Sequence, residues 1–200
     1  GSILLQTAVN GLGAVSMAAV AASGKVTGLF ASPYDAMGTM AATYAGQNLG
    51  AGKLDRVHHG VKDCCILGVA YSLGALVVMY FLGAQMTALF LDSKDVASSA
   101  QILPLARQLL VTNAAFYIPL LGVNLFRFTI QGLGYSNLAV IAGVSEMIAR
   151  GAVAALVSVF GFTAVCYASP AAWVLADCFL LPAYFVCMKR RTKEAAAARE

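Results

Sequence analysis

The stretch "TYAGQNLGAGKLDR", residues 43–56, lies between two long apolar runs and decides how the chain is organised. Three glycines stand close together in it, and an aspartate lies between a lysine and an arginine. Such a segment suits three different structures: a phosphate-binding loop, a metal site, or a turn at a membrane surface.

A phosphate-binding loop requires the pattern G-x-x-x-x-G-K-[ST] after a strand. Here Leu54 follows Lys53, so the hydroxyl that would hold magnesium is missing. A metal site would need converging ligands, but the neighbouring histidines point to different sides of a helix. The candidate ligands are Asp55, His58, His59 and Asp63. A solvated basic turn is the interpretation that the residues favour.

The composition places this turn in a membrane protein. The 200 residues are 60% hydrophobic and 11% charged, with a mean hydropathy of +0.78. Soluble proteins are about 45–50% apolar and about 25% charged. We therefore expect a chain surrounded by lipid, without a nucleic-acid partner. The cysteines lie mostly in apolar runs and are expected to be small buried hydrophobes rather than disulfides or metal ligands. They are Cys64, Cys65, Cys166, Cys178 and Cys187.

A transmembrane helix needs about 20 apolar residues. The expected spans are 14–47, 61–91, 103–130, 138–160 and 163–188, with a truncated one at 1–11. Lipid offers no partner to unpaired backbone groups, and alternating strands of about ten residues are absent, so the spans are expected to be helices. The predicted fold is an all-α integral membrane lobe of six transmembrane helices over residues 1–188, with a basic tail at 189–200. Because the chain opens inside an apolar run, we expect a piece of a longer protein.

The basic residues gather on one side if the helices alternate in direction. They are Lys53, Arg56, Lys62, Arg127, Lys189, Arg190, Arg191 and Lys193. The opposite side has Lys94, with Arg107 nearby. Cytoplasmic segments carry an excess of Lys and Arg, so we expect the first set and the tail to be cytoplasmic.

Five segments follow one another in the order and spacing of the multidrug and toxic compound extrusion (MATE) family. They are "LQTAVNGLG", "AAVAASGKV", "GQNLGAGKLDRVHHG", "FRFTIQGLGYSN" and "SEMIARG". The chain resembles the C-terminal six-helix lobe of that family, and the GQN-x-GAGK-x-(D/E)-R block is the most specific part of the match.

This resemblance implies one half of a twelve-helix antiporter in the plasma membrane, with two lobes around a central cavity. Such a transporter exports organic cations and other amphipathic compounds in exchange for Na⁺ or H⁺, and is neither an enzyme nor dependent on a cofactor. The N-terminal lobe would be the partner. The family's coupling carboxylates lie partly in that lobe, and some branches have another in the tenth helix, where this chain has Asn113, Tyr117 and Asn124.

A polar stripe follows the 103–130 span. Asn113, Tyr117, Asn124, Arg127 and Gln131 fall within roughly 80° of arc at 3.6 residues per turn. Pro119 beside them removes an amide donor and is expected to kink the helix. Two interpretations stay open: a face that lines the central cavity, or hydrogen bonding between helices inside the lobe.

A second stripe follows the 14–47 span and surrounds its only acid, Asp35. Its members are Lys25, Ser32, Thr39, Thr43 and Gln47, with Pro33 and Tyr34 beside Asp35. Cation antiport needs a carboxylate that alternates between ion and substrate, although a neighbouring helix could instead satisfy this one. The predicted substrate and ion pathway comprises Asn10 (the residue after Val9), Tyr34, Asp35, Thr39, Asn113, Tyr117, Asn124 and Arg127.

Three further charges are expected to form a structural cluster without metal. Glu146 and Arg150 stand four residues apart, the favourable order for a helical ion pair. Asp177, on the next antiparallel helix, lies at a similar depth near the membrane midplane. We predict that Arg150 is held by Asp177, Glu146 or both, as a structural clamp without a role in ion coupling.

Two other functions are compatible with parts of the pattern. A lipid or lipid-linked oligosaccharide flippase of the same superfamily would have a more basic cavity. An intramembrane enzyme would need an acid pair, a metal set or a Ser/Lys nucleophile facing a cavity, and the sequence shows no such set.

Overall fold

The computed structural model describes residues 2–91 and 96–197, and these residues are almost entirely helical. The helices are α1 (Ser2–Asn10), α2 (Ala14–Gly50), α3 (Leu54–Ala88), α4 (Val96–Ala115), α5 (Tyr117–Gly132), α6 (Ser136–Phe160) and α7 (Phe162–Ala197). Within the described ranges no strand occurs, so the predicted all-α fold is confirmed. Lys94 lies outside the described residues, as do residues 198–200 of the predicted tail.

Among the described residues, the candidate membrane spans agree with the five complete spans predicted. Helices α2, α3, α6 and α7 are long and apolar enough to cross a membrane, and the bent pair α4–α5 makes a fifth candidate. Helix α1 has nine residues and is too short to cross a membrane by itself. The last span is longer than predicted, because α7 continues through the basic segment to Ala197.

Residues 43–56 connect α2 to α3 through a tight turn, and the same type of turn connects α5 to α6. After α2, the amide of Gly52 donates to the carbonyl of Leu49 and that of Lys53 donates to Asn48. After α5, Gly134 donates to Gln131 and Tyr135 donates to Ile130 in the same pattern. Both glycines have positive φ, 68° and 90°, which glycine adopts without strain. These are Schellman motifs, which terminate helices by satisfying their last carbonyl groups.

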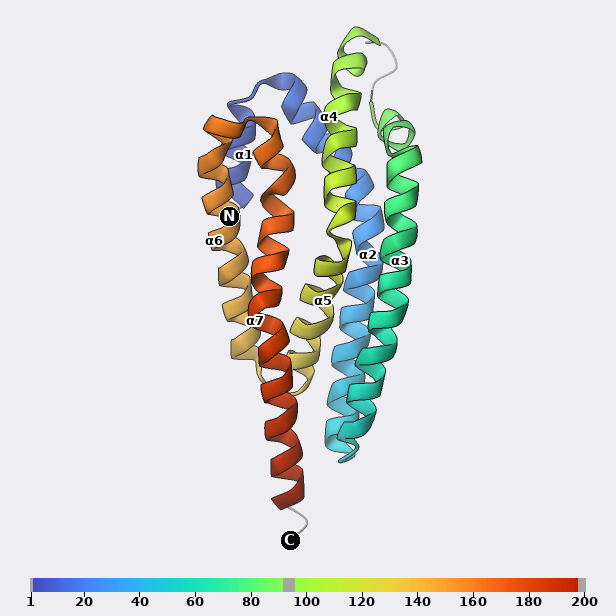
Figure 1. The fold of residues 1–200 in the computed structure, drawn as a ribbon, viewed down its shortest axis with the longest axis vertical. Coiled ribbons are helices and arrows are strands. Elements are labelled where there is room, and N and C mark those ends of the chain that lie inside the picture. The colour runs from blue at the N-terminus through green and yellow to red at the C-terminus, as the bar shows by residue number, and fades with distance from the viewer. Residues whose placement is uncertain (1, 92–95, 198–200) are drawn as a thin grey trace.

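The two turns and the C-terminal end of α7 lie at the same end of the bundle (Figure 1). The turn at Gly161 between α6 and α7 lies at the opposite end, together with the end of α3. The predicted grouping of the basic connections on one side is therefore confirmed.

The fifth span is broken at Phe116. Helices α4 and α5 meet there at a bend of 52°. Pro119 lacks the amide hydrogen that would bond to the carbonyl of Ala115, and its ring crowds that carbonyl. The predicted kink is thus confirmed, and it lies one helical turn before the proline.

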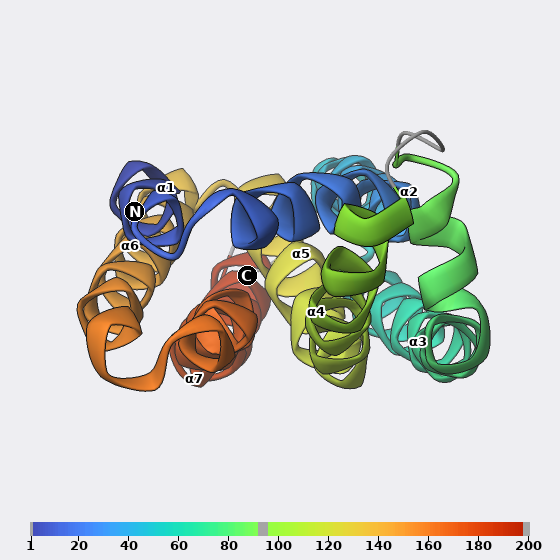
Figure 2. The same cartoon turned by 90° about the horizontal axis from the view of Figure 1, so that it is seen from above.

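Helix α2 lies close to α5 because small residues form the contact. A Cβ atom on Gly132 would lie 2.9 Å from the Cα of Ala42, and one on Gly38 would lie 3.2 Å from the carbonyl oxygen of Asn124. Small residues let membrane helices approach closely and pack their backbones together. Viewed from above, α1 and α2 line one long edge of the bundle, and α7, α4 and α3 line the other (Figure 2). One side of α2 is therefore packed and the other is open.

Candidate functional site

The open side of α2 carries the predicted second stripe. The exposed members are Lys25, Ser32, Asp35, Thr39, Thr43 and Gln47. Thr39 donates its hydroxyl to the carbonyl of Asp35 at 2.9 Å, and Thr43 donates to that of Thr39 at 3.0 Å. We call this surface the α2 polar face. Its hydroxyls are satisfied within the helix, and the carboxylate of Asp35 stays exposed.

An open groove of about 560 Å³ follows the lower half of this face, lined by Ala36, Thr39, Met40, Thr43, Tyr44 and Gln47. A second, mainly apolar pocket of about 300 Å³ lies between α2 and α3. Met40 and Tyr44 line both hollows, and Gly60 makes room for the Tyr44 ring, which a Cβ atom there would meet at 2.6 Å. A polar surface thus adjoins an apolar one, an arrangement that suits an amphipathic molecule.

Tyr34 is the neighbour of Asp35 in sequence but lies on the packed side of α2. Its hydroxyl is 2.8 Å from that of Ser72, and its ring contacts those of Tyr71 and Tyr117 edge-on. Tyr34 was predicted to belong to the pathway together with Asp35. The structure separates the two residues, because successive helical positions differ by about 100°.

The stripe on α4 and α5 does not line an open face. Asn113, Tyr117 and Asn124 are exposed by only 7%, 0% and 9%. The Asn124 amide donates to the Leu120 carbonyl at 3.2 Å, and the Tyr117 ring lies beside that of Trp173. Of the two interpretations of this stripe, the one in which these side chains line an open cavity is wrong, because neighbouring helices cover this side of the bent span. Their part in a transport pathway stays a prediction.

Asn10 ends α1 and is exposed, where its side-chain oxygen accepts a hydrogen bond from Gln6 at 3.2 Å. The side chains of His58 and His59, just after the turn at residues 43–56, diverge as predicted. One ring nitrogen of His58 lies 3.3 Å from the hydroxyl of Tyr184, whereas Nδ1 of His59 lies 2.8 Å from the carbonyl oxygen of Asp55.

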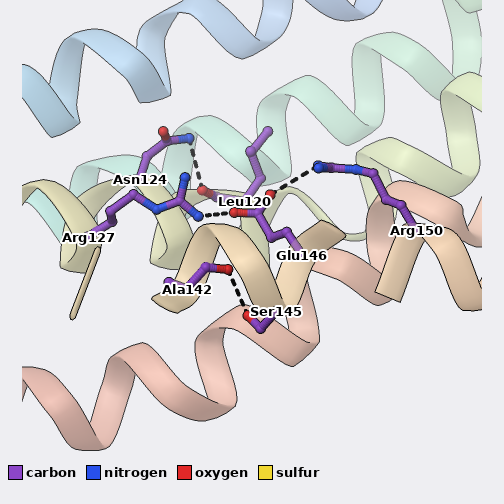
Figure 3. A network of polar contacts seen from close by, with 7 residues as sticks. All are labelled: Leu120, Asn124, Arg127, Ala142, Ser145, Glu146 and Arg150. Atoms are coloured by element: carbon purple, nitrogen blue, oxygen red, sulfur yellow. Dashed lines mark hydrogen bonds and ion pairs between the residues drawn. The ribbon is translucent and has the colours of Figure 1, made fainter. Parts of the chain in front are cut away.

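Glu146 of α6 is the centre of an ion-pair network (Figure 3). One carboxylate oxygen lies 3.0 Å from Nη2 of Arg150, and the other bonds Arg127 of α5. Glu146 is buried, and both arginines are about a quarter exposed. The predicted pair of Glu146 and Arg150 is confirmed, and Arg127 also binds Glu146. The predicted place of Arg127 in the transport pathway stays a prediction.

Asp177 of α7 takes no part in an ion pair among the described residues. Its carboxyl group lies against Gly122 of α5, and its buried Oδ1 has no hydrogen-bond partner. The prediction that Arg150 is held by Asp177, Glu146 or both is thus met by Glu146 alone. Asp177 interacts electrostatically with Arg127, which approaches it from α5.

Sequence reasoning missed the bond between Arg127 and Glu146. The signal was available: the short "GLGYSN" connection makes α5 and α6 antiparallel neighbours, and α5 and α6 pack against one another. An arginine side chain is long enough to reach a carboxylate that lies deeper in the next helix.

Comparisons with known proteins agree with this architecture. A model of the MatE family matches residues 1–156, which is more than half of the chain. No curated protein and no solved structure gives a match. Members of this family are transporters, not enzymes, and are embedded in the membrane. The chain belongs to the MatE family and is a multi-pass membrane transporter.

Proposed function

We propose that this chain is the C-terminal lobe of a cation-coupled antiporter that exports organic cations and other amphipathic compounds. The observation that carries the proposal is the α2 polar face on a membrane-spanning helix. Asp35 lies 15 residues from the end of α2 at Gly50, roughly 22 Å at 1.5 Å per residue. A charge at such a depth costs at least about 2.5–3.5 kcal/mol in lipid. Water or a second lobe must therefore cover this face.

The charges of the face support antiport over lipid transport. Within α2, Lys25 and Asp35 are the charged residues, one of each sign. A pocket for a lipid pyrophosphate would gather basic side chains, as anionic groups require. An exposed carboxylate suits a coupling ion, Na⁺ or H⁺, that alternates with a cationic substrate. The aromatic ring of Tyr44, in the groove along the same helix, suits the apolar part of that substrate.

The coupling role is tested with the full-length protein in proteoliposomes loaded with a fluorescent organic cation. An imposed Na⁺ or H⁺ gradient is expected to drive efflux from wild-type vesicles. Asp35→Asn is expected to lower that rate about tenfold or more, corresponding to about 1.4 kcal/mol of barrier. Asp55→Asn, which removes an exposed carboxylate at the start of α3, is the matched control. Movement of a fluorescent lipid that needs neither gradient would overturn antiport in favour of a flippase.

The proposal also places the two Schellman turns and the basic tail in the cytoplasm, with the protein in the plasma membrane. Single cysteines at Lys53→Cys and Ser136→Cys, in a background with Cys178→Ser, test this orientation. A membrane-impermeant thiol reagent added to intact cells should label neither, and should label both after permeabilisation. Rapid labelling of both in intact cells would reverse the orientation.

A further inference from the structure

Asp177 stands apart from the ion-pair network of Arg127, Glu146 and Arg150. We propose that its carboxyl group is an internal proton-binding site between α5 and α7. On deprotonation, Arg127 moves from Glu146 to Asp177. This inference rests on the proposed antiport and adds a coupling carboxyl inside the lobe, away from the α2 polar face.

The surroundings of Asp177 suit a neutral carboxylic acid. A Cβ atom on Gly122 would lie 2.7 Å from Oδ1 and 2.8 Å from the carboxyl carbon, so the group is packed directly on the α5 backbone. Oδ1 is buried without a hydrogen-bond partner in the described structure. An ionised carboxylate left unpaired in such a place is unfavourable, and binding a proton removes the charge.

The charges that face Asp177 come from two helices. Arg127 on α5 lies close enough to act on it electrostatically, and Arg127 is itself paired with Glu146 on α6, which also holds Arg150. Helix α1 contains no charged residue, and Arg107 on α4 is exposed and donates to the carbonyl of Tyr80 at 3.3 Å. Helix α3 reaches α7 through His58, at the hydroxyl of Tyr184.

The charge balance then changes by one unit. With the proton bound, two arginines share the single negative charge of Glu146, which leaves one positive charge in excess. When Asp177 releases its proton to water, it becomes the second anion, and the four groups are neutral together. Arg127 has a donor available for a second carboxylate, because its Nε is buried and has no hydrogen-bond partner in the structure as described. Arg150 stays on Glu146.

The exchange would be transmitted to the α2 polar face through α5. Arg127 lies on the half of the broken span that packs against α2 through Gly38 and Gly132. In this proposal, the change of partner by Arg127 from α6 to α7 also changes how α5 packs against α2. A packed interface between small residues has few ways to absorb such a shift.

Infrared difference spectroscopy on the full-length protein tests the proton site without any transport assay. The wild type is expected to show a protonated carboxyl band that disappears as pH rises, and Asp177→Asn should abolish it. Asp35→Asn should leave the band in place. A missing band in the wild type, or one that persists in Asp177→Asn, would overturn the proposal.

The packing on Gly122 supplies a second variant. Gly122→Ala places a methyl group where the carboxyl lies and should shift or remove the band. Gly143→Ala, where the new methyl meets nothing within 4 Å, is the matched control. A band that Gly122→Ala leaves unchanged would overturn the placement against α5.

Transport assays distinguish a failure of the Asp177 proposal from a failure of the antiport proposal. Asp177→Asn should flatten the pH dependence of organic-cation efflux in proteoliposomes, while Gly143→Ala keeps the wild-type profile. Wild-type vesicles that move no organic cation under either gradient would defeat the antiport proposal and leave the infrared result standing. Efflux in Asp177→Asn with an unchanged pH profile would defeat the coupling role of Asp177 alone.

Discussion

Two polar regions of this lobe contain similar residues and meet different surroundings. The α2 polar face presents threonines, a glutamine and one carboxylate to the outside of the lobe. The network of Arg127, Glu146 and Arg150 is held between α5 and α6, with a buried carboxylate at its centre. A polar group in a membrane must find either a partner or water. The charged groups of the buried network pair with one another inside the lobe. The polar side chains of the α2 polar face point outward instead. We expect stability to depend on the first region and transport on the second.

The largest loss of stability is expected for Glu146→Gln. It keeps the side-chain shape but leaves Arg127 and Arg150 without their shared counter-charge, and breaking a buried pair costs about 3–5 kcal/mol. The midpoint of thermal unfolding in detergent should fall accordingly. Asp177→Asn is the contrasting variant, because it removes a carboxylate that lacks an ion-pair partner in the described structure. Equal losses for the two variants would contradict the assignment of Glu146 as the centre.

A smaller loss is expected where α2 crosses α5. Gly132→Ala would force a methyl group onto the backbone of Ala42, which cannot rotate away as a side chain can. Overpacking of this kind costs about 1–3 kcal/mol. Gly143→Ala is again the control, since its methyl group has open space. A Gly132→Ala protein as thermostable as Gly143→Ala would show that the two helices are not in backbone contact.

The sequence indicates elements and turns well because their causes are local. Gly52 and Gly134 end their helices through hydrogen bonds within six residues, and Pro119 breaks its span through the carbonyl four positions before it. The pair of Glu146 and Arg150 is likewise one helical turn apart. Each of these features could be predicted without knowing which helix lies next to which.

The sequence could not decide which polar stripe faces outward. The narrow arc through Asn113, Tyr117 and Asn124 holds for a straight helix, whereas the span bends by 52° at Phe116. Its burial also depends on α2, α3 and α7, which are distant in sequence. Two stripes of similar composition thus look alike in sequence, although one is covered and the other is open.

An intermediate effect is expected from Tyr34→Phe on the packed side of α2. The variant keeps the ring contacts and removes the hydroxyl that lies 2.8 Å from Ser72. Ser72 still donates to the carbonyl of Gly68, so one hydrogen bond is lost, worth about 0.5–1.5 kcal/mol. Thermal unfolding measures the loss, with the exposed Tyr44→Phe as the comparison. No difference between the two variants would show that the contact with Ser72 adds nothing to stability.

The smallest effect on stability is expected from a matched pair of threonines. Thr39 of the α2 polar face and Thr129 of α5 each donate a hydroxyl to the carbonyl four residues earlier, at 2.9 Å and 2.7 Å. Thr39 is exposed, and Thr129 is fully buried. Thr39→Val and Thr129→Val therefore remove the same local hydrogen bond from different surroundings.

For Thr39→Val we expect a change of unfolding free energy within about 0.5 kcal/mol, the usual range at exposed positions. Its KM for organic-cation efflux should rise several-fold, because the hydroxyl lines the groove beside Asp35. Thr129→Val should leave the KM unchanged, since its hydroxyl lies inside the lobe and is out of reach of any substrate on α2. Because the local bond is the same in both, a difference in KM must come from the face that each threonine occupies. Equal KM values for the two variants would mean that the α2 polar face does not contact the substrate, and its outward polar groups would then need another explanation.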